Sequence, residues 1–206
     1  MLNIALTKGR LEEKTIELLK KAGVNCDPLL NKGRKLIITL NDKYNIVFAK
    51  ANDVITYVEY GVVDVGVVGK DTLLEMNRPI YEILDLGFGK CTFAVASPLN
   101  VDLFALNKTA TIATKYPNVT REYFESLNMD VDIVKIEGSV ELAPILHLSD
   151  AIVDIVETGK TLKENGLSVI RTIANISARL VVNPASLKLK KTEIEAFSNL
   201  LTSKNN

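Results

Sequence analysis

The sequence has few of the residues that build metal centres or covalent cross-links. Its 206 residues include two cysteines, one histidine and no tryptophan. Cys26 and Cys91 belong to no C-x-x-C motif and no Cys/His cluster, so we expect neither a disulfide nor a zinc site. Asp, Glu and His residues do not cluster in the manner of a protein cage for another metal.

The chain also lacks an excess of either charge and a long apolar run. Lys and Arg number 25, as do Asp and Glu, so no overall field attracts nucleic acid or an anionic membrane. No apolar stretch is long enough to span a bilayer, and the N-terminal apolar run leads directly into Lys8-Gly9-Arg10, unlike a signal peptide. We therefore predict a soluble cytoplasmic protein of one large domain or two small ones, with no nucleic-acid or membrane partner.

Short apolar runs and amphipathic segments alternate along the chain. The pattern predicts strands over residues 2–6, 35–40, 44–49, 62–68, 91–97, 109–114, 131–136, 151–156, 167–173 and 178–183. It predicts helices over residues 11–22, 53–60, 117–127, 162–165 and 187–201, followed by a frayed end at 202–206. This alternation is typical of an α/β fold with mostly parallel sheets.

The strand predicted over residues 151–156 ends in the turn Glu157-Thr158-Gly159-Lys160-Thr161, which precedes a helical segment. Unpaired backbone N–H groups at such a turn, flanked by two hydroxyls, form a cradle for a phosphate. Asp150, Asp154 and Glu157 are expected beside this cradle, where they would repel a bare phosphate. A phosphorylated sugar suits both features, because carboxylates bind sugar hydroxyls while the loop binds the phosphate.

Gly159-Lys160-Thr161 also resembles the end of a P-loop. That motif requires a Gly five residues before Gly159, and the residue there is Asp154, so the match fails. An ordinary strand–turn–helix of an α/β protein stays open as an alternative, because short motifs also occur by chance.

The longer segment over residues 138–162 reads GSVELAPILHLSDAIVDIVETGKTL. It resembles the signature of the ATP phosphoribosyltransferases, which open histidine biosynthesis. The matching positions are Glu141, Ser149, Ile152, Asp154, Ile155, Thr158, Gly159, Thr161 and Leu162. The chain departs from the family at His147, where the family usually has Gly. Residues 5–11, 64–71 and 112–117 resemble three further landmarks of the family, so the resemblance covers nearly the whole chain.

The resemblance implies two α/β lobes similar to the type II periplasmic binding proteins. Lobe one would be discontinuous, with residues 1–90 and 180–206, and lobe two, residues 91–179, would carry the loop. Long family members have a C-terminal regulatory domain, which we expect this chain to lack, as the short form does. Short forms work with a regulatory subunit related to the catalytic core of histidyl-tRNA synthetase. A homodimer within a larger hetero-oligomer is also implied.

The implied reaction joins adenine N1 of ATP to C1 of 5-phosphoribosyl-1-diphosphate and releases diphosphate. The attacking nitrogen has no proton to lose, so catalysis should depend on positioning and charge stabilisation, and His147 is not needed as a base. Asp154 and Glu141 would hold the ribose hydroxyls, although Asp154 capping a loop is the alternative. Mg²⁺ is implied as an ion that arrives with the substrate phosphates. The residues that would bind the 5-phosphate are Glu157, Thr158, Gly159, Lys160 and Thr161.

Basic residues near the N-terminus are the candidates for contact with the diphosphate and the triphosphate. Lys8 and Arg10 lie in the first strand-to-helix turn and Lys50 follows a second strand, where open α/β sheets bind ligands. We assign Arg10, Arg34 and Lys50 to catalysis and Lys8 to substrate binding. Lys8 and Arg34 as merely solvated side chains are the alternative. Asp71 would contact adenine or organise these cations, or else cap a helix.

Two other functions compete with this prediction. A non-catalytic binding module is one, because solute-binding proteins share the two-lobed fold and a fold does not fix a function. The set Glu141, Asp154 and Thr158-Gly159-x-Thr161 argues against it. A P-loop hydrolase is the other, and it would release phosphate from ATP without the phosphoribosyl donor.

Overall fold

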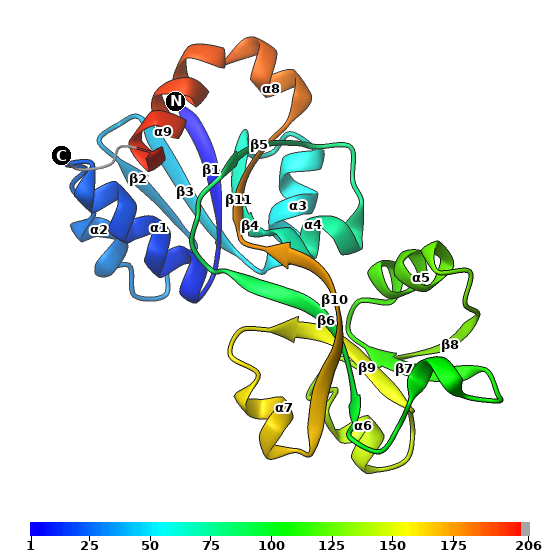
Figure 1. The fold of residues 1–206 in the computed structure, drawn as a ribbon. Helices are drawn as coiled ribbons and strands as arrows, with labels where there is room; N and C mark the ends of the chain where they lie inside the picture. Colours follow the sequence, from blue (N-terminus) through cyan, green and yellow to red (C-terminus); the bar gives the residue numbers. More distant parts are fainter. Residues whose placement is uncertain (203–206) are drawn as a thin grey trace. The chain divides into compact units, whose positions relative to one another are not determined.

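The computed structural model describes residues 1–202, so the rest of the predicted frayed end, residues 203–206, lies outside the described residues (Figure 1). The chain divides into two compact units. Unit 1 comprises Met1–Gly89 and the chain from Ser177 onward, and unit 2 comprises Lys90–Ile176. The chain therefore passes between the units twice, and each unit has a sheet of its own.

Unit 1 is built on a six-stranded sheet with the strand order β2-β3-β1-β4-β11-β5. The strands are β1 (Leu2–Thr7), β2 (Ile37–Leu40), β3 (Tyr44–Ala49), β4 (Val65–Gly69), β5 (Tyr81–Asp85) and β11 (Ala178–Val182). The helices are α1 (Arg10–Lys21), α2 (Asp27–Leu30), α3 (Ala51–Glu59), α4 (Lys70–Met76), α8 (Pro184–Leu189) and α9 (Lys191–Thr202). Strand β1 is parallel to both neighbours, β3 and β4, so the carboxyl ends of these three strands meet at one edge of the sheet.

Side chains of β1 contribute to the core on both faces of this sheet. Leu2, Ile4 and Leu6 belong to a buried cluster with residues of α1 and α9. Ala5 points to the other face and joins a cluster with residues of α3. A strand covered on both faces has few polar positions, which explains the apolar run at the N-terminus.

Unit 2 is built on a five-stranded sheet with the strand order β10-β6-β9-β7-β8. The strands are β6 (Cys91–Pro98), β7 (Ala110–Thr114), β8 (Val131–Lys135), β9 (Ala151–Val156) and β10 (Leu167–Ile176). The helices are the 3₁₀ helix η1 (Leu103–Ala105), α5 (Pro117–Ser126), α6 (Leu142–Ile145) and α7 (Lys160–Glu164). Ile152 of β9 belongs to a buried cluster with Ala143 of α6 and Leu162 of α7, so these helices cover one face of β9.

The predicted α/β class is confirmed, and both sheets are mixed, so the parallel share is smaller than predicted. Each sheet has two parallel pairs, and its other pairs are antiparallel. Antiparallel pairing of β2 with β3 follows from a tight turn at Asn41 and Asp42, whose φ angles are 50° and 51°. Asn and Asp tolerate this left-handed conformation better than most residues.

The single helix predicted over residues 187–201 is wrong, because two helices, α8 and α9, occupy this region. Asn183 caps α8 and Pro184 occupies its first turn, and Lys190 then separates it from α9. Strand β5 was not predicted, because all five of its side chains are exposed or half-buried and show no apolar alternation.

Candidate functional site

The loop after β9 has the backbone geometry of an anion cradle. Gly159 is the N-cap of α7 and adopts the left-handed conformation, with φ 71° and ψ 3°. The Lys163 N–H closes the first turn on the Gly159 carbonyl at 3.1 Å, and the Lys160 N–H donates to Thr158 Oγ1 at 3.4 Å. The other N–H groups of this first turn have no partner within the helix. Since α7 has only five residues, these N–H groups matter more for an anion than the helix dipole does.

The acids predicted to hold the ribose lie beside this loop. Asp154 points to the same face of β9 as Ile152, which α6 and α7 cover. Glu141 is the N-cap residue of α6 and is half-buried, as is Asp154. A hollow of about 200 Å³ brings the whole predicted set together, lined by Glu141, Asp154, Glu157, Thr158, Gly159, Lys160 and Thr161 among others.

The Lys160 side chain is exposed and has only a loose ion pair with a residue of its own helix. Its exposed fraction is 79%, and Nζ lies 3.7 Å from Glu164 Oε1, one helical turn further along. The backbone of residues 157–161 is therefore the better source of anion contacts in this loop.

Thr114 was not predicted as a site residue, and it supports the middle of β9, next to Asp154. Its buried hydroxyl donates to the Val153 carbonyl at 2.7 Å and accepts from the Tyr116 N–H at 2.9 Å. This bond fixes the backbone just before Asp154. No sequence signal marks Thr114, because a Thr at a strand end has many ordinary roles.

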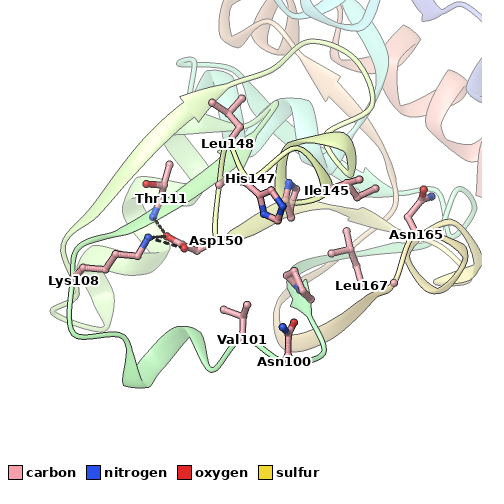
Figure 2. A pocket seen from close by; sticks show the side chains of 14 residues that line it. Asn100, Val101, Lys108, Thr111, Ile145, His147, Leu148, Asp150, Asn165 and Leu167 are labelled. Carbon is pink, nitrogen blue, oxygen red and sulfur yellow. Dashed lines mark hydrogen bonds and ion pairs between the residues drawn. The ribbon is translucent and has the colours of Figure 1, made fainter.

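A second, larger hollow of about 520 Å³ lies at the opposite end of β9 and contains Asp150 in its wall (Figure 2). Lys108 Nζ donates to both Asp150 carboxylate oxygens at 2.8 and 2.9 Å, and the Thr111 N–H donates to Oδ2 at 2.9 Å. Burial raises the pKa of Asp150, but these donors outweigh it and hold the pKa below its ordinary value.

The prediction that Asp150 lies beside the phosphate cradle is therefore wrong. Asp150 precedes β9 and Glu157 follows it, so the six-residue strand separates them by roughly 20 Å. Among the described residues that line the larger hollow, Lys108 is the only Lys or Arg, and Asp150 already pairs with it. This hollow is consequently a poor site for a polyanionic substrate.

His147 lies in the wall of this larger hollow and has a φ of 57° (Figure 2). The Leu148 N–H donates to the Ala143 carbonyl at 2.8 Å, and the His147 N–H donates to the Pro144 carbonyl at 3.1 Å. This pair of bonds is a Schellman motif that ends α6, and His147 occupies the left-handed position where Gly is preferred. The departure from the family pattern at His147 thus affects the turn that ends α6, at the opposite end of β9 from the cradle.

In unit 1, the predicted basic residues come to the edge where β1, β3 and β4 end. Thr7 pairs with Ala49, and the Lys8 N–H donates to the Ala49 carbonyl at 2.9 Å, which places Lys8 beside Lys50. Arg10 begins α1 directly after β1. All three side chains are exposed at this edge.

Arg34 reaches the same edge through strand register. Strand β2 is antiparallel to β3 with Ile37 opposite Val47, and the Phe48 N–H donates to the Leu36 carbonyl at 2.9 Å. Arg34 lies in the turn two residues before Leu36, where this pairing with the end of β3 begins. The exposed loop containing Arg34 therefore lies near the other three predicted cations.

Asp71 lies in the first turn of α4, but Gly69 is the N-cap of that helix. A Cβ placed on Gly69 would lie 2.0 Å from Asp71 Oδ1, so the carboxylate packs directly against the glycine. The alternative in which Asp71 is the cap is thus wrong, and its role toward adenine or the cations stays a prediction.

Neither a metal cage nor a membrane-crossing helix is found in residues 1–202. No three His, Cys, Asp or Glu side chains in that range are grouped so as to hold a metal ion. No helix in the described part of the chain is both long and apolar enough to cross a bilayer.

Comparisons with known proteins agree with one another. A family model described as HisG, ATP phosphoribosyltransferase, matches residues 50–203. An ATP phosphoribosyltransferase of Clostridium kluyveri is 58% identical over 199 residues, covering 96% of this chain and 91% of that protein. One of Clostridium novyi is 60% identical over 194 residues, covering 93% of this chain and 92% of that protein.

Two solved structures are similar to the fold. The ATP phosphoribosyltransferase (HisG:HisZ) complex from Thermotoga maritima matches with a TM-score of 0.85 and 38% identity, covering 98% of this chain and 96% of that chain. The periplasmic aliphatic sulphonate binding protein SsuA from Escherichia coli matches with a TM-score of 0.58 over 97% of this chain and 72% of that chain. At 12% identity, the second likeness concerns the fold alone, and it confirms the predicted periplasmic-binding-protein type.

Proposed function

The chain belongs to the ATP phosphoribosyltransferase family, and we propose that the hollow at the carboxyl end of β9 is its site for 5-phosphoribosyl-1-diphosphate. The enzyme condenses ATP with this donor in the first step of histidine biosynthesis. The observation that carries the assignment of the site is the convergence of Glu141, Asp154 and the loop Glu157–Thr161 on one hollow.

The chemistry asks this site to bind and orient the donor rather than to move a proton. Adenine N1 attacks the sugar C1 with its lone pair, the bond from C1 to the diphosphate breaks, and the diphosphate leaves with that electron pair. The sugar becomes electron-poor on the way, so a carboxylate such as Asp154 near the ribose stabilises the transition state while it holds a hydroxyl. The loop fixes the 5-phosphate, which orients the ring.

The basic edge of unit 1 is the proposed site for the other phosphates. Arg10, Arg34 and Lys50 stabilise the charge of the diphosphate and the triphosphate, and Lys8 adds a fourth cation. Their common edge supports this role, since ligands of α/β sheets bind beyond the carboxyl ends of parallel strands. Asp71, which follows β4 at this edge, orders the cations or contacts adenine.

Mg²⁺ is proposed to arrive on the substrate phosphates and to neutralise part of the charge on the departing diphosphate. A substrate-borne ion fits the part of the chain that the structure describes, where no protein cage is found. The cytoplasm is the proposed location, because ATP and phosphoribosyl diphosphate are metabolites of that compartment.

A regulatory subunit related to histidyl-tRNA synthetase is the proposed partner, with the catalytic chain as a homodimer in the larger assembly. The T. maritima relative, whose structure is that of a two-component complex, supports this short form. The proposed lobes are residues 1–90 with 180–206, and residues 91–179.

Formation of phosphoribosyl-ATP, followed by absorbance, tests the function. The purified chain is assayed with ATP, the donor and Mg²⁺, first alone and then with its regulatory subunit. We expect product, with a large gain when the subunit is added. Absence of product in both assays, with both proteins folded, would contradict the proposal. Phosphate release from ATP without the donor would instead support a hydrolase.

A further inference from the structure

A small cluster of three side chains, Glu12, Lys32 and Phe48, lies in unit 1 beside the basic edge. Lys32 Nζ donates to Glu12 Oε1, and the same ammonium lies 3.8 Å from the centroid of the Phe48 ring. The exposed fractions of the Lys32 and Glu12 side chains are 24% and 11%, so this ion pair is largely removed from water. A pair in such surroundings is screened less by solvent and salt than a surface pair.

The cluster joins the three segments that carry the proposed catalytic cations. Glu12 lies two residues after Arg10 in the first turn of α1, and Phe48 lies two residues before Lys50 near the end of β3. Lys32 lies two residues before Arg34 in the loop between α2 and β2. Each member is thus anchored in a different segment, and only the Lys32 side chain reaches both of the others.

Lys32 is also the one inward-packed residue of its loop. Residues 31 and 33–36 are exposed, whereas Lys32 is half-buried. Backbone bonds shape the loop locally, with the Asn31 N–H donating to the Asp27 carbonyl and the Lys35 N–H to the Lys32 carbonyl. The Lys32 side chain therefore joins the loop to α1 and adds a side-chain contact with Phe48 of β3 to the backbone bond from the Phe48 N–H to the Leu36 carbonyl.

We infer that Lys32 and Glu12 are positioning residues that hold the Arg34 loop against α1 and β3, so that Arg10, Arg34 and Lys50 meet the substrate phosphates together. This rests on the proposed role of the basic edge. The Glu12 carboxylate also offsets the Lys32 charge, which would otherwise add a further uncompensated cation to that edge. The Phe48 ring favours the ammonium through its electron-rich face.

Steady-state kinetics of four variants test the inference, each with ATP and the donor varied in turn. For Lys32→Met we expect a rise in KM for at least one substrate of about five-fold or more, together with a lower melting temperature, because the largely buried Glu12 carboxylate loses its partner. Lys32→Arg should restore KM, because a guanidinium keeps the ion pair and the ring contact. Glu12→Gln should raise the same KM. Lys35→Met, at an exposed lysine of the same loop, is the matched control and should leave KM unchanged.

The double variant Lys32→Met, Glu12→Gln completes a double-mutant cycle and leaves no unpaired buried charge. If the two residues act as one unit, its KM stays close to that of either single variant instead of rising by the product of the two effects. Two results would overturn the inference. One is an unchanged KM in both Lys32→Met and the double variant. The other is a variant that partly fails to fold while the fraction that does fold has the wild-type KM. The wild-type chain in the same assay separates the two proposals, since an inactive wild type would count against the proposed function itself.

Discussion

At the scale of single residues, His147 occupies a backbone position that costs stability. Its φ of 57° is left-handed, and a side chain beyond glycine pays roughly 1–2 kcal/mol there. The hydrogen bonds that end α6 nevertheless require this conformation, because His147 is the C′ residue of the Schellman motif. The exposed imidazole is two residues from the buried Ser149 Oγ, which has no hydrogen-bond partner among the described residues.

We predict that His147→Gly raises the free energy of unfolding by about 1 kcal/mol, because glycine adopts the required φ without strain. Urea unfolding of the purified chain measures the change. His147→Ala is the control and should bring little gain, because its Cβ keeps the strain. Turnover should not change, since His147 is at the other end of β9 from the cradle. A lower free energy of unfolding in His147→Gly would contradict this account of the turn.

The loop and its acids were predictable at this scale because their spacing is local. Asp154, Gly159 and Thr161 lie within eight residues on one strand and the turn after it. Their short separation in the sequence is nearly enough to place them around one hollow. Asp150 belongs to the same run, and its misplacement shows the limit of this reasoning. Residues that are close in the sequence can lie at opposite ends of an extended strand, as Asp150 and Glu157 do.

At the scale of elements, Asp64 joins the start of β1 to α8 and to Lys190, the residue that follows α8. Its buried carboxylate accepts from the Asn3 N–H at 2.8 Å, from Ser186 Oγ at 2.7 Å and from Lys190 Nζ at 2.7 Å. Burial raises the pKa of Asp64, but the bonds from Lys190, Asn3 and Ser186 outweigh it, so the pKa lies below its ordinary value.

We predict that Asp64→Asn lowers the free energy of unfolding by about 2 kcal/mol at pH 7, because charge-assisted bonds are lost. A depressed pKa in the folded state means that the stabilisation is complete above the unfolded-state pKa and is lost as the pH falls through the folded-state pKa. The difference between wild type and variant should therefore be constant from pH 7 to about 5 and shrink below that.

Urea unfolding at several pH values measures this difference. Asp130→Asn, at an exposed carboxylate, is the control and should have little effect. A difference that grows toward low pH would contradict the role of the ionised Asp64.

The boundaries of helices and strands were predictable where the apolar pattern is regular. They were missed where a capping residue sets the end of a helix. Strands β3 and β9 begin and end where the apolar runs predict. The start of α8 depends on Asn183, whose side chain accepts from the Ala185 and Ser186 N–H groups and donates to the Val58 carbonyl. The capping bonds are local, but the bond to Val58 spans more than a hundred residues of sequence, so the local pattern does not reveal that partner.

At the scale of the whole molecule, the basic edge of unit 1 shows what sequence alone does not supply. Lys8 and Arg10 were predictable, because a strand-to-helix turn in an α/β fold is a ligand site. The place of Arg34 depends on the register of β2 against β3, and the contact between Lys32 and Glu12 spans twenty residues. The first follows from sheet pairing and the second from packing of the loop against α1, and the periodicity of a single segment determines neither.

The proposed function requires that the hollow at the carboxyl end of β9 binds the phosphoribosyl donor with Asp154 at the ribose. The most direct measurement is turnover of Asp154→Asn, with far-UV circular dichroism to establish that the fold is intact. We predict a fall in turnover of about 100-fold with an unchanged spectrum, because a carboxylate facing the reacting sugar is lost. Asp150→Asn, at the other end of the strand, should keep most of the turnover. An unchanged rate in Asp154→Asn would remove Asp154 from the site and contradict the claim.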